Sequence, residues 1–380
     1  MRESGLSNIL NSTLRLSLAL LLVTACAQRS DKDRVLNAFS ETMRLAPTDS
    51  IALEAFEILA PEDVAVHHDG WFIVDKSMDT NAIDIINPES GEKIECFRKG
   101  RGPGEILLIG PIQYSDGMLY VYDLSREIYY TLDVDATIHA GRQVLRQGLK
   151  LGSDDDGHGS FNQPYFLFRV RNAIMATGIF PEGLWYGILD DSLTKIKSGV
   201  PLVEYQTTRN MSEATRSAFQ LSSYISFSPD GRRGVCAMLD CGTFSLFETD
   251  GNTVTEYFRK IYYEPKLIEP SGEIISPGHD KSNLDAFYGA ETASDRFYLL
   301  FSGKPVGDRE SPSSECSHLL VYDWTGNPVR RYELEKAINS IYLHDGRIYG
   351  SSMYPESRIY VYDLPQQEDS AHGSVARPGR

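Results

Sequence analysis

Hydrophobic residues in this chain recur in short runs separated by turn-forming residues, without the spacing of long amphipathic helices. Apolar runs rich in β-branched and aromatic residues, such as 71–74 (WFIV) and 297–300 (FYLL), follow two-residue turns within a few positions. A second run usually follows each of them and ends at a polar residue. This pattern predicts short antiparallel strands joined by tight hairpin turns.

The hairpin turns recur six times, at spacings of 47, 55, 59, 64 and 51 residues, and they are Asp69-Gly70, Asp116-Gly117, Arg171-Asn172, Asp230-Gly231, Ser294-Asp295 and Asp345-Gly346. The polar residue that ends the second run follows the turn after 17, 16, 18, 17, 28 and 17 residues, at Asn87, Asp133, Asp190, Glu248, Asp323 and Asp363. The long fifth offset comes from an insertion at 303–317, whose Gly, Pro, Ser and charged residues are typical of a loop. The chain therefore contains six similar units.

Each unit accommodates about four strands of about six residues, which is the size of a propeller blade. We therefore predict an all-β fold, a six-bladed β-propeller over residues 51–365. The sixth unit has three strands, and the run Ile51–Leu59 is expected to supply its missing outer strand and close the ring. The competing architecture is a pair of packed β-sandwich domains.

The six polar residues that end the second runs have two interpretations. They could form a ring of catalytic carboxylates, or they could start turns, because Asp and Asn side chains accept hydrogen bonds from the backbone two residues on. Their sixfold recurrence favours turns, since a catalytic residue would break the symmetry of the repeat. Aromatic residues on the strands are likewise expected to fill the spaces between blades.

The N-terminus carries a ten-residue apolar run, 16–25, preceded by Arg2 and Arg15. Ten helical residues span about 15 Å, half of a bilayer core, so the run predicts a signal peptide over residues 1–25. It ends in Val-Thr-Ala-Cys, which resembles the bacterial lipobox and makes Cys26 the expected lipid attachment site. The alternative is an ordinary secretory signal in which Cys26 is incidental.

The predicted propeller is flanked by two segments, residues 26–50 and residues 366–380. Residues 26–50 are predicted to be the lipidated N-terminus and a tether, in which the apolar positions 35, 36, 39 and 43 could form a short amphipathic helix. Residues 366–380 are polar and are predicted to be a disordered tail. We expect the protein at the bacterial outer membrane, lipid-anchored and facing either the periplasm or the cell surface.

The composition and net charge of the chain exclude some classes of function. The chain has 380 residues, 41% of them hydrophobic, and a net charge of -16, with no basic run that could bind phosphates. Nucleic acid is therefore not an expected partner, and we expect a monomer. Besides Cys26, the chain has Cys96, Cys236, Cys241 and Cys316, too few for a disulfide scaffold. Cys236 and Cys241 could form a local disulfide, although buried free thiols are the favoured interpretation.

Recognised catalytic motifs are absent from the sequence, including the Ser nucleophile elbow, His-Glu-x-x-His and Cys-x-x-Cys. We therefore assign no catalytic residue, metal ligand or cofactor. His67 and His68 are the adjacent pair among the eight histidines. Because consecutive strand residues point to opposite faces, this pair is a poor two-ligand unit unless it lies in the turn, and His68 is expected to be a turn residue.

After the first unit comes the hexapeptide Gly100–Glu105 (GRGPGE). With the lipobox and the six units, it resembles the six-bladed, TolB-like propeller lipoproteins of Bacteroidota, in which a Gly-x-Gly-Pro-Gly-Glu loop follows the first blade. The resemblance implies the fold and the compartment, and it places the hexapeptide near the mouth of the central channel, where Arg101 or Glu105 could contact a ligand. The competing interpretation is a tight connection between blades, with glycines at positive φ and Pro103 stiffening the turn.

Two functions follow as hypotheses. The leading one is a lipid-anchored, non-catalytic propeller that binds a protein, peptide or glycan of the cell envelope. The alternative is a metal-dependent enzyme of the lactonase or lyase type, whose axial Asp, Asn and Glu ligands would come from different blades and would leave no sequence motif.

Overall fold

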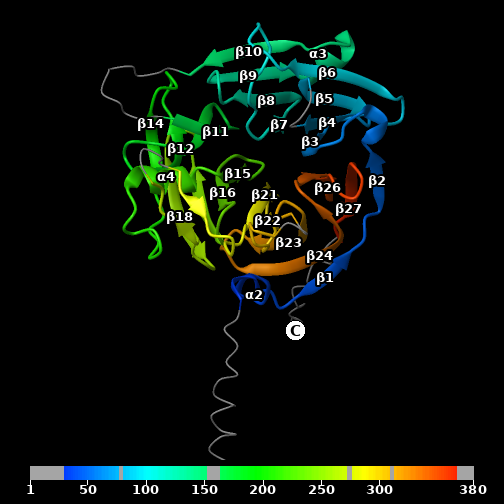
Figure 1. Ribbon diagram of the computed structural model, residues 1–380. Helices are drawn as coiled ribbons and strands as arrows, with labels where there is room; N and C mark the ends of the chain where they lie inside the picture. The colour runs from blue at the N-terminus through cyan, green and yellow to red at the C-terminus, as the bar shows by residue number, and fades with distance from the viewer. Residues whose placement is uncertain (1–29, 77–79, 152–162, 272–275, 309–311, 366–380) are drawn as a thin grey trace, which may run out of the picture.

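The computed structural model of the chain describes residues 30–76, 80–151, 163–271, 276–308 and 312–365. Within these residues, six mainly antiparallel sheets surround a central axis, and the strands of each sheet lie side by side from the centre to the periphery (Figure 1). The predicted six-bladed propeller is confirmed. No described helix is long and apolar enough to cross a membrane.

The strands of blades one to three follow chain order from the axis outward and are β3 (Pro61–Val66), β4 (Phe72–Lys76), β5 (Asn81–Asn87), β6 (Glu92–Arg98), β7 (Gln113–Ser115), β8 (Met118–Asp123), β9 (Ile128–Asp133), β10 (Leu145–Lys150), β11 (Gln163–Val170), β12 (Ala173–Ile179), β13 (Leu184–Leu189) and β14 (Ile196–Pro201). The strands of blades four to six are β15 (Ser223–Phe227), β16 (Arg233–Met238), β17 (Thr243–Thr249), β18 (Val254–Ile261), β21 (Phe287–Thr292), β22 (Arg296–Phe301), β23 (Cys316–Asp323), β24 (Pro328–Ile338), β25 (Tyr342–His344), β26 (Arg347–Ser352) and β27 (Arg358–Asp363). The other elements are α2 (Asp31–Leu36), β1 (Thr42–Leu45), β2 (Asp49–Ala52), the 3-10 helix η1 (Glu54–Phe56), α3 (Val134–Ala140), α4 (Glu213–Gln220), and the hairpin of β19 (Leu267–Ile268) and β20 (Gly278–His279).

Each predicted hairpin turn lies between the first and second strands of its blade. The first turn residue often has positive φ, at 55° in Asp69, 52° in Asp116 and 48° in Asp345. Arg171 adopts the same conformation at 51°, so blade three forms its turn without glycine. The six predicted turns therefore occupy the same place in every blade.

Several of the polar residues after the second runs start turns, as predicted. The Asn87 Oδ1 atom accepts hydrogen bonds from the backbone N–H groups of Glu89 and Ser90. The Asp133 Oδ1 atom accepts one from Ala136 N–H and so caps α3. Because these carboxylate and amide oxygens are engaged in local backbone contacts, they support turn formation rather than a catalytic ring.

The ring is closed by the N-terminal strand β2, which pairs with β27 and becomes the outer strand of blade six. Closure was predicted, but the strand spans Asp49–Ala52 instead of Ile51–Leu59. The chain leaves the sheet after Ala52 because the following apolar side chains turn inward into the core, namely Leu53, Phe56 and Ile58.

Residues 30–45 pack against the propeller, so the prediction of a tether is wrong for this part of the chain. A short helix, α2, is present, but it ends at Leu36 and contains only two of the four expected positions, because Phe39 follows it and Met43 lies on β1. The Val35 side chain near the C-terminal end of α2 is fully buried. Phe39 packs edge-on against Tyr322, with 5.1 Å between the ring centroids. Strand β1 then pairs in parallel with β24, as a fifth strand of blade five (Figure 1). Residues 26–29 lie outside the described residues.

The core lies between neighbouring blades and is rich in aromatic side chains. In its largest cluster, the Phe244 ring contacts the rings of Phe287, Phe297 and Tyr322. Cys96, Cys236, Cys241 and Cys316 are buried and free, which confirms the preferred interpretation of the cysteines. The insertion at 303–317 forms, where it is described, the connection between β22 and β23 up to residue 315, and its last two residues begin β23. The predicted disordered tail, 366–380, lies outside the described residues.

Candidate functional site

A cavity of about 670 Å³ occupies the central channel, which places it within the size range of ligand-binding pockets. Its wall is built from the first strand of every blade and the residues just before it. These strands are short, and both polar and apolar side chains from them line the cavity. The central channel is therefore the candidate binding site.

One layer of the channel wall is formed by residues that lie at a constant distance in the sequence from the hairpin turns. The residue seven positions before the second residue of each hairpin turn lines the cavity in every blade, and these residues are Asp63, Gly110, Tyr165, Tyr224, Tyr288 and Asn339. Three adjacent blades thus contribute a tyrosine to the layer, and each of these side chains is half-buried. We call this set the axial layer.

The axial layer is partly fixed by hydrogen bonds. The Tyr288 hydroxyl donates to Asp285 Oδ2 at 2.8 Å, and the Asn339 amide donates to the carbonyl oxygen of Pro61 at 2.9 Å. The Asp63 carboxylate accepts a hydrogen bond from Val64 N–H at 2.8 Å. These three side chains are therefore pre-positioned, which lowers the entropic cost of binding.

Carboxyl groups in and behind this wall are poorly solvated. Burial raises the pKa of Asp63 to about 7, although hydrogen bonds from Val64 and Ser340 favour its charged form. Burial, together with the charge of Asp63, raises the pKa of Glu291 to about 8. Asp75 lies behind Asp63, and burial raises its pKa well above the usual range. At pH 7 Asp63 is therefore about half protonated, whereas Glu291 and Asp75 are mostly protonated, and a protonated carboxyl group can donate as well as accept hydrogen bonds.

The hexapeptide lies away from the channel, so the expectation that it sits at the channel mouth is wrong. Neither Arg101 nor Glu105 lines the cavity, and the loop instead bonds to blade two. Arg126 donates to the carbonyl oxygens of Gly102 and Glu105 at 3.1 and 2.8 Å, and Gln143 donates to that of Gly104 at 3.0 Å. The connection from β6 to β7 folds over blade two and so carries the loop outward.

The glycines of the hexapeptide have structural explanations. The Glu105 carboxylate turns back over the loop and accepts a hydrogen bond from Gly102 N–H at 2.6 Å. A Cβ atom at Gly100 would lie 2.1 Å from Glu105 Oε2, so a side chain there would displace the Glu105 carboxylate from this position. Gly104 has a φ of 74°. These contacts agree with a tight connection between blades, while ligand contact by Arg101 or Glu105 stays a prediction.

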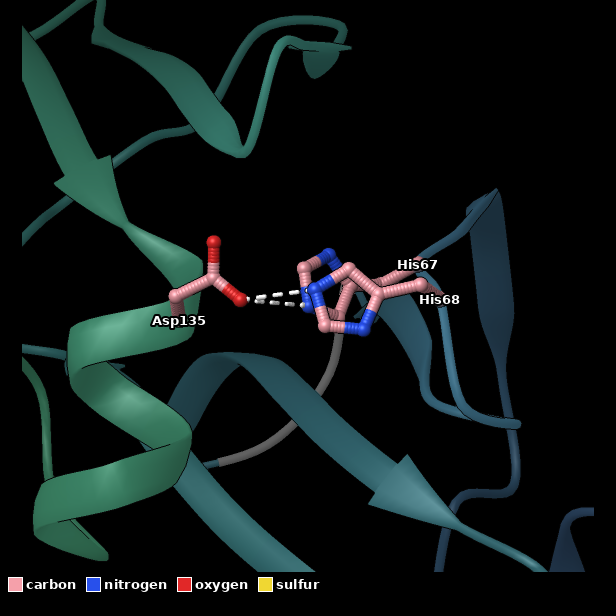
Figure 2. Close-up of side chains that lie close together, drawn as sticks. All are labelled: His67, His68 and Asp135. Atoms are coloured by element: carbon pink, nitrogen blue, oxygen red, sulfur yellow. Dashed lines mark hydrogen bonds and ion pairs between the residues drawn. The ribbon is translucent and has the colours of Figure 1, made fainter.

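His67 and His68 follow the end of β3, at the hairpin turn, and their rings face the same way (Figure 2). The Nε2 atoms of both rings approach Asp135 Oδ1, at 3.2 Å for His67 and 2.8 Å for His68. The rule of opposite faces does not apply here, because the backbone has already left the strand at His67. Among the described residues, this is the one group of at least three His, Cys, Asp or Glu side chains whose possible ligand atoms all lie within 4.8 Å of one another.

The enzyme hypothesis required metal ligands on the axis, and the converging group lies elsewhere. None of its three residues lines the channel, and the channel carboxyl groups of the described residues do not converge in this way. The axial tyrosines were not singled out from the sequence, although their constant distance from the turns is a signal that could have found them. The predicted lipid attachment site, Cys26, lies outside the described residues.

Comparison with known proteins agrees with this fold. The family model described as TolB-like 6-blade propeller-like matches residues 171–346, from the hairpin turn of blade three to that of blade six. The resemblance to TolB-like six-bladed propellers is thereby confirmed. No protein with a curated function matches the chain.

Solved structures to which this chain is similar include two from Bacteroides. A protein of Bacteroides fragilis described as exported has 8% sequence identity and a TM-score of 0.49, over 86% of this chain and 100% of its own. A member of the DUF4221 family from Bacteroides vulgatus has 9% identity and a TM-score of 0.48, over 84% of this chain and 97% of its own.

Proposed function

We propose that this TolB-like six-bladed propeller is a lipid-anchored binding module of the bacterial cell envelope, whose central channel takes a neutral, hydroxyl-rich ligand such as a segment of a glycan. The observation that carries the proposal is the axial layer, in which Tyr165, Tyr224 and Tyr288 stand next to Asp63 and Asn339 around one cavity. The envelope location rests on the signal-peptide pattern and Cys26.

The chemistry of the channel favours a neutral ligand over a strongly charged one. Half-buried tyrosine rings offer apolar faces to the C–H surfaces of a sugar, and their hydroxyl groups offer hydrogen bonds. The raised pKa values leave Glu291 mostly uncharged and Asp63 about half uncharged at pH 7, and in the uncharged form both pair with hydroxyl groups without a counter-ion. A glycan presents both kinds of surface along its length.

Replacing Tyr224 by alanine is expected to weaken glycan binding by about tenfold or more, because an aromatic contact in a largely desolvated pocket contributes about 1.5 kcal/mol or more. Tyr224→Ala and wild type would be titrated calorimetrically against a panel of short, soluble oligosaccharides. Tyr257→Ala is the matched control, because Tyr257 lies on the outer strand β18 and is 42% exposed.

Two outcomes would count against the channel as a glycan site. Equal affinities of Tyr224→Ala and wild type for a sugar that binds would place the binding site elsewhere on the protein. Binding of a peptide library, with no binding of any oligosaccharide, would replace the glycan by a peptide ligand.

Replacing Cys26 by serine is expected to move the protein from the membrane fraction to the soluble fraction, because a single thiol carries the proposed acyl chains. The measurement is fractionation of producing cells together with metabolic labelling by a palmitate analogue. Cys316→Ala removes a buried thiol instead and should leave both the labelling and the membrane association unchanged. Unchanged labelling of Cys26→Ser would exclude this residue as the attachment site.

A further inference from the structure

We propose that His67, His68 and Asp135 bind a divalent transition-metal ion, with Zn²⁺ as the ion best matched to two imidazoles and one carboxylate. The site joins two blades, because both histidines follow β3 of blade one and Asp135 lies on α3 of blade two. None of the three residues lines the channel, so the proposal goes beyond the proposed function and stands independently of it.

The geometry is close to that of a bound ion. The two Nε2 atoms lie 3.2 and 2.8 Å from the same oxygen, Oδ1 of Asp135 (Figure 2). In tetrahedral zinc sites with bonds of about 2.0–2.1 Å, neighbouring ligand atoms are about 3.3 Å apart. Shifts of a few tenths of an ångström would therefore admit the ion. The His68 and Asp135 side chains are exposed, at 62% and 61%, and leave the fourth position to water.

Oxygen atoms on the far side of both rings set the ring orientations. The Nδ1 atom of His67 lies 2.5 Å from the Tyr114 hydroxyl oxygen, and that of His68 lies 2.9 Å from Asp69 Oδ2. When each Nδ1–H donates to its oxygen, each Nε2 carries the lone pair that a metal needs. Metal-bound histidines usually have such a partner, which fixes the tautomer and the direction of the ring.

One buried polar atom of the group lacks a hydrogen-bond partner. The His68 ring bridges two carboxylates, with its Nδ1 atom 2.9 Å from Asp69 Oδ2 and its Nε2 atom 2.8 Å from Asp135 Oδ1. His67 is 2% exposed, and its Nε2 atom has no hydrogen-bond partner although it lies 3.2 Å from Asp135 Oδ1. A buried polar atom left unpaired destabilises the folded protein, and coordination of an ion would remove that cost.

The test is calorimetric titration of the full chain in detergent with ZnCl₂ at pH 7.5, after removal of metals with a chelator. Wild type is expected to bind one Zn²⁺ per chain. His68→Ala and Asp135→Asn are expected to weaken this binding by about 100-fold or more, since even loss of an outer-sphere partner costs about 10- to 100-fold. Both positions are exposed, so circular dichroism should show that the variants stay folded.

His344→Ala is the matched control. His344 precedes the Asp345-Gly346 turn as His68 precedes Asp69-Gly70, and its Nε2 atom lies 3.5 Å from Asp345 Oδ2, but Leu343 stands where His67 would be. This variant should bind Zn²⁺ like wild type. Absence of stoichiometric binding to wild type, or equal affinities of wild type, His68→Ala and Asp135→Asn, would overturn the proposal.

Cobalt offers a second readout that a purely structural role would not produce. Wild type loaded with Co²⁺ should show the visible absorption of a low-symmetry Co²⁺ site with nitrogen ligands, and His68→Ala should lack it. Affinity should also fall as the pH is lowered, because protons compete for His68. An absorption spectrum identical in wild type and His68→Ala would contradict the assignment.

Discussion

Replacing Lys76 by methionine is expected to lower the free energy of unfolding by about 3–5 kcal/mol, the typical cost of leaving a buried charge unpaired. The Lys76 Nζ atom lies 2.7 Å from Asp84 Oδ2, and the two side chains are only 3% and 0% exposed. Asn81 donates to the other carboxylate oxygen at 2.6 Å. Burial already raises the pKa of Asp84, and Lys76 opposes that shift. Equilibrium unfolding in urea measures the loss.

Two variants separate the loss of the buried charge pair from general damage. In Lys76→Met/Asp84→Asn no unpaired charge remains, so part of the lost stability should return. Arg347→Met breaks the Arg347–Asp363 pair, whose side chains are 54% and 50% exposed, and should cost much less. A Lys76→Met variant as stable as Arg347→Met would mean that Asp84 is solvated or neutral in the folded protein.

Stability is expected to fall by about 2–4 kcal/mol between pH 6.5 and 8.5, in contrast to proteins whose carboxylates are stabilised by folding. Burial raises the pKa of Asp63 to about 7 and those of Glu291 and Asp240 to about 8. In the unfolded chain these acids are already ionised near pH 5. The folded state therefore holds more protons across this window, and its advantage is lost as the pH rises through the folded pKa values.

The histidines whose pKa is lowered contribute little to that slope, whereas the raised pKa of His68 acts in the same direction as the buried acids. Burial lowers the pKa of His67 and His279, and lowers that of His318 to about 4, so their titrations finish near or below pH 6.5. Midpoints of thermal unfolding across the pH window would measure the effect.

Variants of single acids test the origin of the pH dependence. Glu291→Gln should flatten the fall in stability, because it removes one of the protons released above pH 7. Asp280→Asn should not, because Asp280 is exposed and hydrogen bonds from Ser282 hold its pKa below the usual range. A constant unfolding midpoint in wild type across the window would mean that water solvates these carboxyl groups in the folded protein.

The amino-acid sequence by itself determined the six units and their closure. Turn residues such as Asp69-Gly70 act through local backbone conformation, and apolar runs such as 71–74 act through their periodicity. Both signals come from residues that are close together in the sequence, so the six blades could be predicted without knowledge of contacts between distant residues. The same local logic identified the turn-forming role of Asn87 and Asp133, which the backbone hydrogen bonds bear out.

The tertiary structure alone decided which side chains meet. Residues 30–45 pack on blade five and do not form a tether. They do so because Val35 and Phe39 fit a surface formed by residues some 290 positions later in the chain. The hexapeptide was expected at the channel and lies over blade two, because the backbone path after β6 set its direction.

The candidate sites likewise depend partly on the sequence and partly on the tertiary structure. Asp63 and Tyr224 approach one cavity from blades one and four, and His68 meets Asp135 across 67 residues of sequence. Sequence spacing records the register of each strand within its own blade, so it contains the seven-residue offset of the axial layer. It does not record the packing of one blade against the next, because those contacts form only when all the sheets close around the axis.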